Sequence, residues 1–419
     1  MIFQTPEVQE REAEVLRRVD EVRTRLNYAL KTPRRWTGVL RRNLTARAVQ
    51  GSNSIEGYNV TFEDAIAAIE GEEPMDAAPE PWAAVTGYRN ALTYIMQLSD
   101  DTHFNLNEEL IRALHNLMLL HDPTKHPGRW RPGSIYVRRE PSGEIVYEGP
   151  DAGDVPRLVR EFLEANRNTQ DTSLHAIIRA AMAHLNLVMI HPFSDGNGRM
   201  GRAVQTLVLA RADILAPPFC SIEEWLGSRG NTQAYYDVLA QVGAGSWNPG
   251  RDARPWLRFC LNAHLQQAFT VSRRVKETER LWGELEIELA RRKLDDRMVP
   301  ILYDAAIGIR VRSARYRLIA EVSSQVAARD LRALVHEGLL QPKGEKRGRS
   351  YIASEHLHAI FTQTREPRIS HENPFQVEMA AATATKEMPA ARLASAAVAA
   401  PVRGYSPASQ GHADQPDRF

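Results

Sequence analysis

A wide apolar stripe over residues 174–190, followed at once by a polar turn, is the feature that most constrains the fold of this chain. Its apolar residues recur at helical spacing, which predicts a helix buried along most of its surface. Pro192 disfavours helical backbone at His191, and glycine and asparagine in 195–198 tolerate the positive φ of a tight turn. We therefore expect two packed helices joined by this turn, the second covering about 199–212.

Composition bounds the class of protein. The chain has 419 residues, is 43% hydrophobic and 25% charged, and carries a net charge of +1, so two or three ordinary globular domains are expected. Its two cysteines support neither a disulfide framework nor a zinc motif. The first residues lack a signal-peptide pattern, and no run of about 18 apolar residues suggests a membrane span. We expect a cytoplasmic protein with no membrane partner.

Helical periodicity dominates the rest of the chain and predicts a mainly α fold. One exception is 134–148, where two β-rich runs flank Pro141-Ser142-Gly143 and predict a hairpin. The composition changes near residue 290, and beyond about 365 the chain becomes rich in alanine and proline. Helices are predicted at 8–30, 81–99, 107–120, 155–166, 231–241 and 254–269. The predicted domains are an N-terminal helical region (1–100), a catalytic domain (101–270), a helical linker (271–295), a winged helix (296–362) and a disordered tail (363–419).

The segment HPFSDGNGRMGR, residues 191–202, has the parts of a phosphate site. Unpaired amides at a turn and a helix N-terminus bind anions. Arg199 and Arg202 are three residues apart, so they share one helix face. Asp195 is a candidate Mg²⁺ ligand beside phosphate oxygens, and His191 is a candidate general base. These residues predict transfer of a phosphorus-containing group to a hydroxyl.

This segment resembles the signature of the Fic family, His-Pro-Phe-x-(Asp/Glu)-Gly-Asn-Gly-Arg-x-x-Arg, at every specified position. The similarity covers roughly residues 50–265. Family members mostly transfer AMP from ATP to Ser, Thr or Tyr hydroxyls of proteins. The resemblance implies that His191 is the base and that Asp195 binds Mg²⁺. It implies a nucleotide site formed by the motif residues Gly196, Asn197, Gly198, Arg199, Met200, Gly201 and Arg202, with Arg202 at the γ-phosphate.

Further stretches resemble family elements. A kinase relative, the Doc type, has lysine at the position of Gly198, so glycine favours AMP transfer; phosphocholine transfer stays open. The hairpin at 134–148 resembles the flap that pairs with a target segment. RGNTQAYYDVL resembles the segment that closes over the nucleotide, which makes Asn231 and Tyr235 candidate contacts and leaves Tyr236 as an alternative core residue. Trp130, in PGRWR, is expected to pack.

A second short motif, SNSIEG, matches the inhibitory pattern of the family at Ser52 and Glu56, and Gly57 is expected to end its helix. In similar proteins the glutamate pairs with the second motif arginine, here Arg202. A carboxylate there repels the γ-phosphate and prevents productive ATP binding. The alternative is a glutamate at an ordinary helix end. Thr61 is expected to cap the following helix.

The C-terminal module, 296–362, is interpreted as a winged helix. Between 309 and 352 it has ten basic and four acidic residues, a modest basic surface for DNA. The alternative is a module that packs or docks protein.

The overall prediction is a protein adenylyltransferase that uses ATP and Mg²⁺, modifies a target protein and itself, and is inhibited by Glu56. A homodimer is a further expectation. Two alternatives remain: a DNA-binding regulator that senses nucleotide, and an enzyme of the same fold that removes AMP. A zinc hydrolase is disfavoured, because His184 is expected to pack in the core and no third ligand has suitable spacing.

Overall fold

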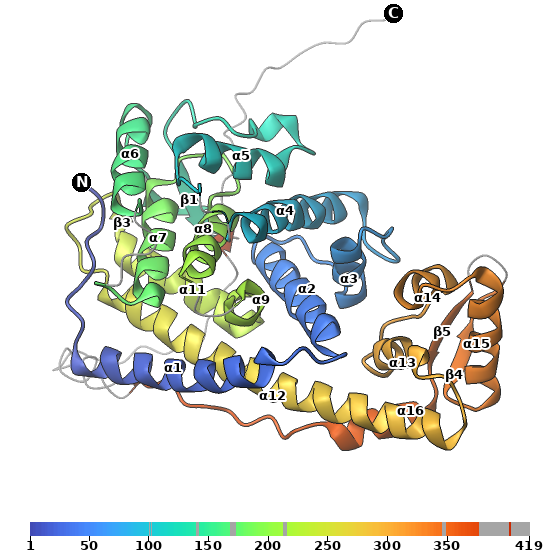
Figure 1. Ribbon diagram of the computed structural model, residues 1–419. Coiled ribbons are helices and arrows are strands. Elements are labelled where there is room, and N and C mark those ends of the chain that lie inside the picture. The colour runs from blue at the N-terminus through green and yellow to red at the C-terminus, as the bar shows by residue number, and fades with distance from the viewer. Residues whose placement is uncertain are drawn as a thin grey trace, which may run out of the picture.

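The computed structural model describes residues 1–99, 101, 103–139, 142–167, 173–212, 216–345, 349–376 and 402–403. Figure 1 shows a larger helical body and a smaller lobe, with one long helix running along the bottom from the first to the second. The mainly helical fold agrees with the prediction.

The larger body contains helices from α1 to α11. Their bounds are α1 (Glu10–Lys31), α2 (Thr37–Ile55), α3 (Phe62–Glu70), α4 (Pro79–Leu98), α5 (Glu108–Leu119), α6 (Val155–Ala165), α7 (Ala176–Ile190), α8 (Asn197–Arg211), α9 (Pro217–Cys220), α10 (Glu223–Leu226) and α11 (Arg229–Gly243). The expected caps are present: the side chains of Asn107 and Thr61 accept hydrogen bonds from the backbone N–H groups of Leu110 and Asp64.

Helices α7 and α8 form the centre of this body. The apolar stripe predicted for 174–190 is buried on nearly every side of α7. A Cβ atom on Gly201 of α8 would lie 2.6 Å from the His184 ring and 2.6 Å from Val188. Glycine therefore lets the two helices approach closely, and this contact fixes the place where their connecting turn lies.

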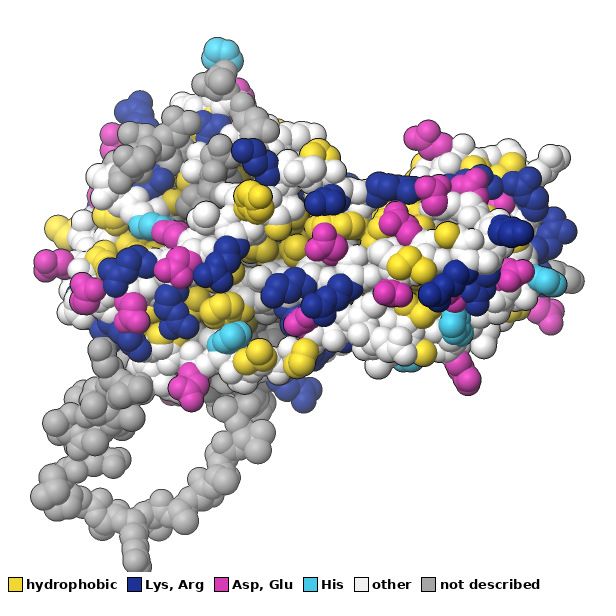
Figure 2. Space-filling model, turned by 60° about the horizontal axis from the view of Figure 1, so that its bottom comes forward, with side chains coloured by type: hydrophobic (Ala, Val, Ile, Leu, Met, Phe, Trp, Pro, Cys, Tyr) yellow, Lys and Arg dark blue, Asp and Glu magenta, His cyan; other side chains and the backbone are white. Residues whose placement is uncertain are grey.

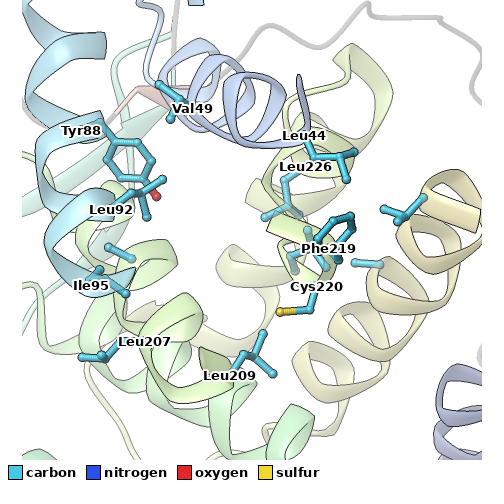
Figure 3. Close-up of a cluster of buried hydrophobic side chains, with 14 of the residues drawn as sticks. Leu44, Val49, Tyr88, Leu92, Ile95, Leu207, Leu209, Phe219, Cys220 and Leu226 are labelled. Atoms are coloured by element: carbon cyan, nitrogen blue, oxygen red, sulfur yellow. The ribbon is translucent and has the colours of Figure 1, made fainter. Parts of the chain in front are cut away.

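Helix α2 packs across the end of this pair. Val49 of α2 lies near Tyr88 and Leu92 of α4, and Leu44 lies near Leu226 and Phe219 in the same apolar cluster (Figure 3). At Gly51 the helix backbone lies against Glu223, since a Cβ there would fall closer than 3.0 Å to the Glu223 carbonyl. The position of α2 is thus set by close backbone packing.

The predicted hairpin is present as β1 (Tyr136–Arg139) and β2 (Glu144–Glu148), paired antiparallel with Val137 opposite Tyr147 and a bulge after Val137. β3 (Gly245–Ser246) pairs parallel to β2, and β6 (Val402–Arg403) pairs antiparallel to β1. The hairpin is therefore the middle of a four-stranded sheet beside α7 and α11.

Helix α12 (Arg254–Arg291) is a single helix of 38 residues. The sequence predicted a helix at 254–269 and a helical linker at 271–295. The structure joins them in one continuous helix, because apolar residues continue to recur through Val271, Val275, Leu281 and Leu285, all of which are buried.

The smaller lobe contains α13 (Val299–Ala306), α14 (Ser313–Ala320), α15 (Ser324–His336), the antiparallel pair β4 (Leu340–Lys343) and β5 (Ser350–Ala353), and α16 (Glu355–Thr364). A single bridge joins Val311 to Tyr351. The winged-helix interpretation of 296–362 stays a prediction.

The basic residues of this lobe do not all face solvent. Arg315 is buried and pairs with Asp304 and Glu70, and Arg310 pairs with Glu63 and Asp76. Figure 2 shows Lys and Arg interleaved with acids over the lobe. Lys346 and Arg347, which the sequence assigned to the wing, lie outside the described residues. The charge available for DNA is smaller than the sequence count suggests.

The segment after α16 packs against the body. Phe375 is buried, and the Pro374 carbonyl accepts hydrogen bonds from Arg11. The tail predicted from residue 363 therefore begins too early: the chain stays in contact with the body through 376, because Phe375 still offers apolar surface to bury. Within the described residues, no helix combines the length and apolar character that crossing a bilayer requires.

Candidate active site

His191 ends α7 in the left-handed conformation, with φ 51°. Its Nδ1 lies 2.9 Å from the Val188 carbonyl, which only accepts, so Nδ1 carries the proton and Nε2 is left as the basic nitrogen. Burial lowers the pKa of His191 to about 4. The imidazole is therefore neutral at pH 7, as a general base must be.

Arg131 holds the backbone around this histidine. Its Nε donates to the His191 carbonyl at 2.8 Å, and its own N–H donates to the Pro192 carbonyl at 2.9 Å. Its Nη1 donates to Gly133, at the start of the hairpin. Arg131 thus joins the hairpin to the motif. Trp130, in the same PGRWR segment, packs against Phe193 as expected, whereas the role of Arg131 was not predicted.

The turn between α7 and α8 is closed by Asn197. Its Oδ1 accepts from the Phe193 N–H and its Nδ2 donates to the Phe193 carbonyl, both at 2.9 Å. Gly196 caps α8 with φ 75°. The first-turn amides from Asn197 to Arg199 have no acceptor within the helix, which is the arrangement that binds anions at a helix N-terminus; we call these amides the cradle.

Arg199 is the candidate anion ligand with the most unsatisfied donors at the cradle. Its side chain is 1% exposed, yet its Nε and Nη1 atoms find no hydrogen-bond partner among the described residues. A buried guanidinium without acceptors is costly. A phosphate at the cradle would satisfy it.

The Arg202 guanidinium is hydrogen-bonded to residues at the end of α2. Its Nε donates to the Ser52 hydroxyl at 2.7 Å, and its Nη2 donates to the Ser52 carbonyl at 3.0 Å and to Glu56 Oε1 at 2.6 Å. Burial would lower the pKa of this guanidinium, but Glu56 raises it above its ordinary value. Both predicted inhibitory residues therefore contact the arginine that the resemblance assigns to the γ-phosphate.

The end of α2 places the Glu56 carboxylate in the cradle. Glu56 is the C-cap, Gly57 has φ 85°, and the Tyr58 N–H returns to the Asn53 carbonyl at 3.0 Å, which is a Schellman turn. A Cβ atom on Gly198 would lie 2.5 Å from Glu56 Oε1. The carboxylate thus lies against the first turn of α8.

Asp195 lies beside the cradle, but both of its oxygens have partners. Oδ1 accepts from the Gly196 N–H at 2.6 Å, and Oδ2 lies 2.7 Å from Lys125 Nζ in the 3-10 helix η1 (Pro123–Lys125). Burial would raise the pKa of Asp195, but Arg199 and Lys125 lower it, so the carboxyl is ionised. No group of three His, Cys, Asp or Glu side chains suited to a metal occurs in the described part of the chain. The carboxylate suits Mg²⁺ chemically, but the site does not fit the ion while Lys125 is bound.

A mainly apolar pocket opens next to His191 and Gly198. The hairpin contributes Val137 and Tyr147, and α11 contributes Tyr235 and Tyr236. Both tyrosines therefore line the pocket. Tyr235 is buried with its hydroxyl 3.1 Å from His184, whose other ring nitrogen bonds Gln205, so His184 packs as expected. The Tyr236 hydroxyl donates to the Ile55 carbonyl at 2.9 Å, so α11 contacts the end of α2.

Three predicted nucleotide contacts lie elsewhere. The Asn231 amide donates to the Trp225 carbonyl and the Ser228 hydroxyl, at the start of α11. Met200 is buried in the core, and Gly201 faces α7. These residues position α11 and α8 and do not line the pocket. Sequence reasoning missed Lys125 and Tyr58, which have no motif around them.

Two packed helices, a polar turn with a neutral histidine, an anion cradle and a flanking hairpin together define a Fic-type domain. Residues 105–209 match the model of the Fic/DOC family. These residues of the chain are therefore similar to the Fic domain of that family.

Curated proteins with similar sequences carry the name of a Fic adenylyltransferase. "Protein adenylyltransferase Fic" of Drosophila mojavensis is 30% identical over 210 residues, which are 50% of this chain and 37% of that protein. The protein of the same name from Nematostella vectensis is 27% identical over 255 residues, 61% of this chain and 55% of that protein. The match therefore spans less than two thirds of these relatives.

A Fic family protein from Desulfovibrio desulfuricans G20, known from its crystal structure, has the same fold. It aligns with a TM-score of 0.53 and 23% identity, over 84% of this chain and 99% of that one.

Proposed function

We propose that this protein transfers AMP from ATP to a hydroxyl of a target protein, and to itself, and that Glu56 holds the activity down. The buried arginine pair carries the proposal: Arg199 has unsatisfied donors beside a helix N-terminus, and Arg202 is paired with a carboxylate in the same cradle. Such a site accepts a polyphosphate once the carboxylate leaves.

His191 supplies the base. With Nδ1 bonded to Val188, its Nε2 takes the proton of the attacking Ser, Thr or Tyr hydroxyl as the oxygen bonds to the α-phosphorus. Pyrophosphate leaves. Arg199 and Arg202 compensate the charge of the phosphates, and the apolar pocket with Tyr235 and Tyr236 receives the adenosine. Once Lys125 leaves Asp195, that carboxylate would hold Mg²⁺, which neutralises phosphate charge when bound.

The intact His191 favours an enzyme over a nucleotide-sensing regulator, since sensing requires no base. The internal ion pairs of Arg310 and Arg315 also reduce the basic surface that DNA binding requires. Removal of AMP by the same site is the remaining alternative, in which Glu56 would orient water. Pairing of Glu56 with Arg202 disfavours it in the present arrangement.

ATP labelled at different phosphates distinguishes AMP transfer from the alternative reactions. The Glu56→Gly variant is incubated with ATP labelled at either the α- or the γ-phosphate. We expect α-label on protein and, by mass spectrometry, a gain of one AMP on a hydroxyl residue; the same variant with His191→Ala is the control. γ-Label alone would indicate phosphate transfer and refute the proposal, as would the absence of both labels. If labelled AMP were lost from a modified substrate faster with the wild-type protein than with the Glu56→Gly variant, the result would favour AMP removal.

A further inference from the structure

Lys125 occupies the side of Asp195 where a divalent cation would bind. Its Nζ lies 2.7 Å from Asp195 Oδ2, while Oδ1 accepts from the Gly196 N–H. The side chains of Lys125 and Asp195 are only 23% and 18% exposed, so water screens this pair weakly. An ammonium and a divalent cation compete for the same oxygen, because both need its lone pairs and they repel each other.

Tyr58 holds Lys125 in this place. Lys125 Nζ donates to the Tyr58 hydroxyl at 2.7 Å. The Tyr58 ring lies 5.4 Å from Lys125 Nζ and 5.2 Å from the Arg199 guanidinium carbon, so one aromatic ring contacts both cations of the site. Asp122 lies farther from Lys125 Nζ, at 3.9 Å.

Tyr58 and Glu56 belong to the same Schellman turn at the end of α2. Glu56 reaches Arg202 on one side, and Tyr58 reaches Lys125 on the other. Because the Tyr58 N–H is bonded to the Asn53 carbonyl, the backbone that carries both side chains is held in one turn. Movement of this turn would loosen both contacts together.

We propose that Lys125 is a cation that excludes the divalent metal from Asp195 and that Tyr58 positions it, so the end of α2 blocks the site at the metal as well as at Arg202. This inference rests on the proposed function for its biological meaning. The competition between Lys125 and a metal for Asp195 is measurable without any transfer of AMP.

The test measures Mn²⁺ affinity by electron paramagnetic resonance of the free ion, with saturating β,γ-imido ATP. All variants carry Glu56→Gly, so that the analogue can enter. Lys125→Met should tighten Mn²⁺ binding by roughly ten- to a hundredfold, the value of a charge-assisted hydrogen bond. Tyr58→Phe, which keeps the ring, should tighten it by about two- to tenfold.

Two controls locate the effect. Lys276→Met removes an exposed lysine of α12 and should leave Mn²⁺ affinity unchanged. Asp195→Asn added to Lys125→Met should abolish the gain. Unchanged or weaker Mn²⁺ binding in folded Lys125→Met would overturn the inference; if that variant does not fold, an unchanged affinity in Tyr58→Phe would do so.

The experiment distinguishes failure of the proposed Lys125 role from failure of the proposed AMP transfer. Tighter Mn²⁺ binding without AMP transfer would leave the cation role in place and remove the proposed function. AMP transfer with unchanged Mn²⁺ binding would do the opposite.

Discussion

The proposed inhibition depends on the bond between Glu56 and Arg202, and Glu56→Gly removes that bond. The two atoms are 2.6 Å apart, and the side chains of Arg202 and Glu56 are 1% and 13% exposed. A charge-assisted hydrogen bond in such surroundings is worth about 1.5–3 kcal/mol. At about 1.4 kcal/mol per tenfold change, self-modification should rise roughly ten- to a hundredfold.

The assay follows incorporation of α-labelled ATP into the purified protein. Glu56→Gln keeps the shape of the side chain and removes its charge, so it should produce a smaller rise than glycine. Arg202→Ala added to Glu56→Gly should lose much of the gain, because the γ-phosphate then lacks its partner. The two changes should not be additive, since they share one interaction.

Equal rates for wild type and folded Glu56→Gly would refute this reasoning. Glu56 would then be only a helix end, and the close approach of its carboxylate to Gly198 would have no bearing on nucleotide binding.

Three further predictions concern the base, the packing of α2 and the C-terminal lobe. His191→Ala should lower transfer by roughly 10²–10⁴-fold with nucleotide binding kept, measured by calorimetry. Because the pKa of His191 is lowered to about 4, the base is neutral above that pH, and its protonation should reduce the rate near pH 4 and not near 6.5. Gly51→Ala should destabilise the fold by about 1–3 kcal/mol and raise self-modification by displacing α2. Gly38→Ala in the same helix, where a Cβ meets nothing within 4 Å, should do neither. Equal melting temperatures for the two variants would contradict this prediction. If the lobe binds DNA, the affinity should fall steeply with salt, and the double variant Arg347→Ala, Arg349→Ala should weaken binding to all DNA sequences alike. If no duplex is retarded in a gel at low salt, the interpretation of the lobe as a protein-docking module remains.

The residues that the sequence located correctly are those with a local signal. Pro192 and Gly196 indicated the turn between α7 and α8, and Gly57 indicated the end of α2. Proline disfavours helical backbone at the residue before it, and both glycines adopt the positive φ that few other residues tolerate. The contact of Glu56 with Arg202 came from the family resemblance, since no local pattern predicts a pair separated by 146 positions.

The residues that the sequence missed act over long range. Lys125 reaches Asp195 from a short 3-10 helix, and Arg131 supports His191 through its carbonyl. Asn231 was assigned to the nucleotide, although its amide completes the start of α11. A polar side chain in a loop has many partners within reach, and only the fold determines which one it contacts.

The ion pair between α2 and the smaller lobe matters for any experiment that truncates the protein. Arg42, near the start of α2, bonds Asp304 of α13 and Glu70 of α3, and Ile309 packs on Ala65 and Ile66. Deleting the lobe near residue 290 would leave Arg42 without Asp304 and expose that apolar contact to water. The isolated N-terminal part would then have a differently supported α2, so a rate measured on that fragment would not describe the chain of 419 residues.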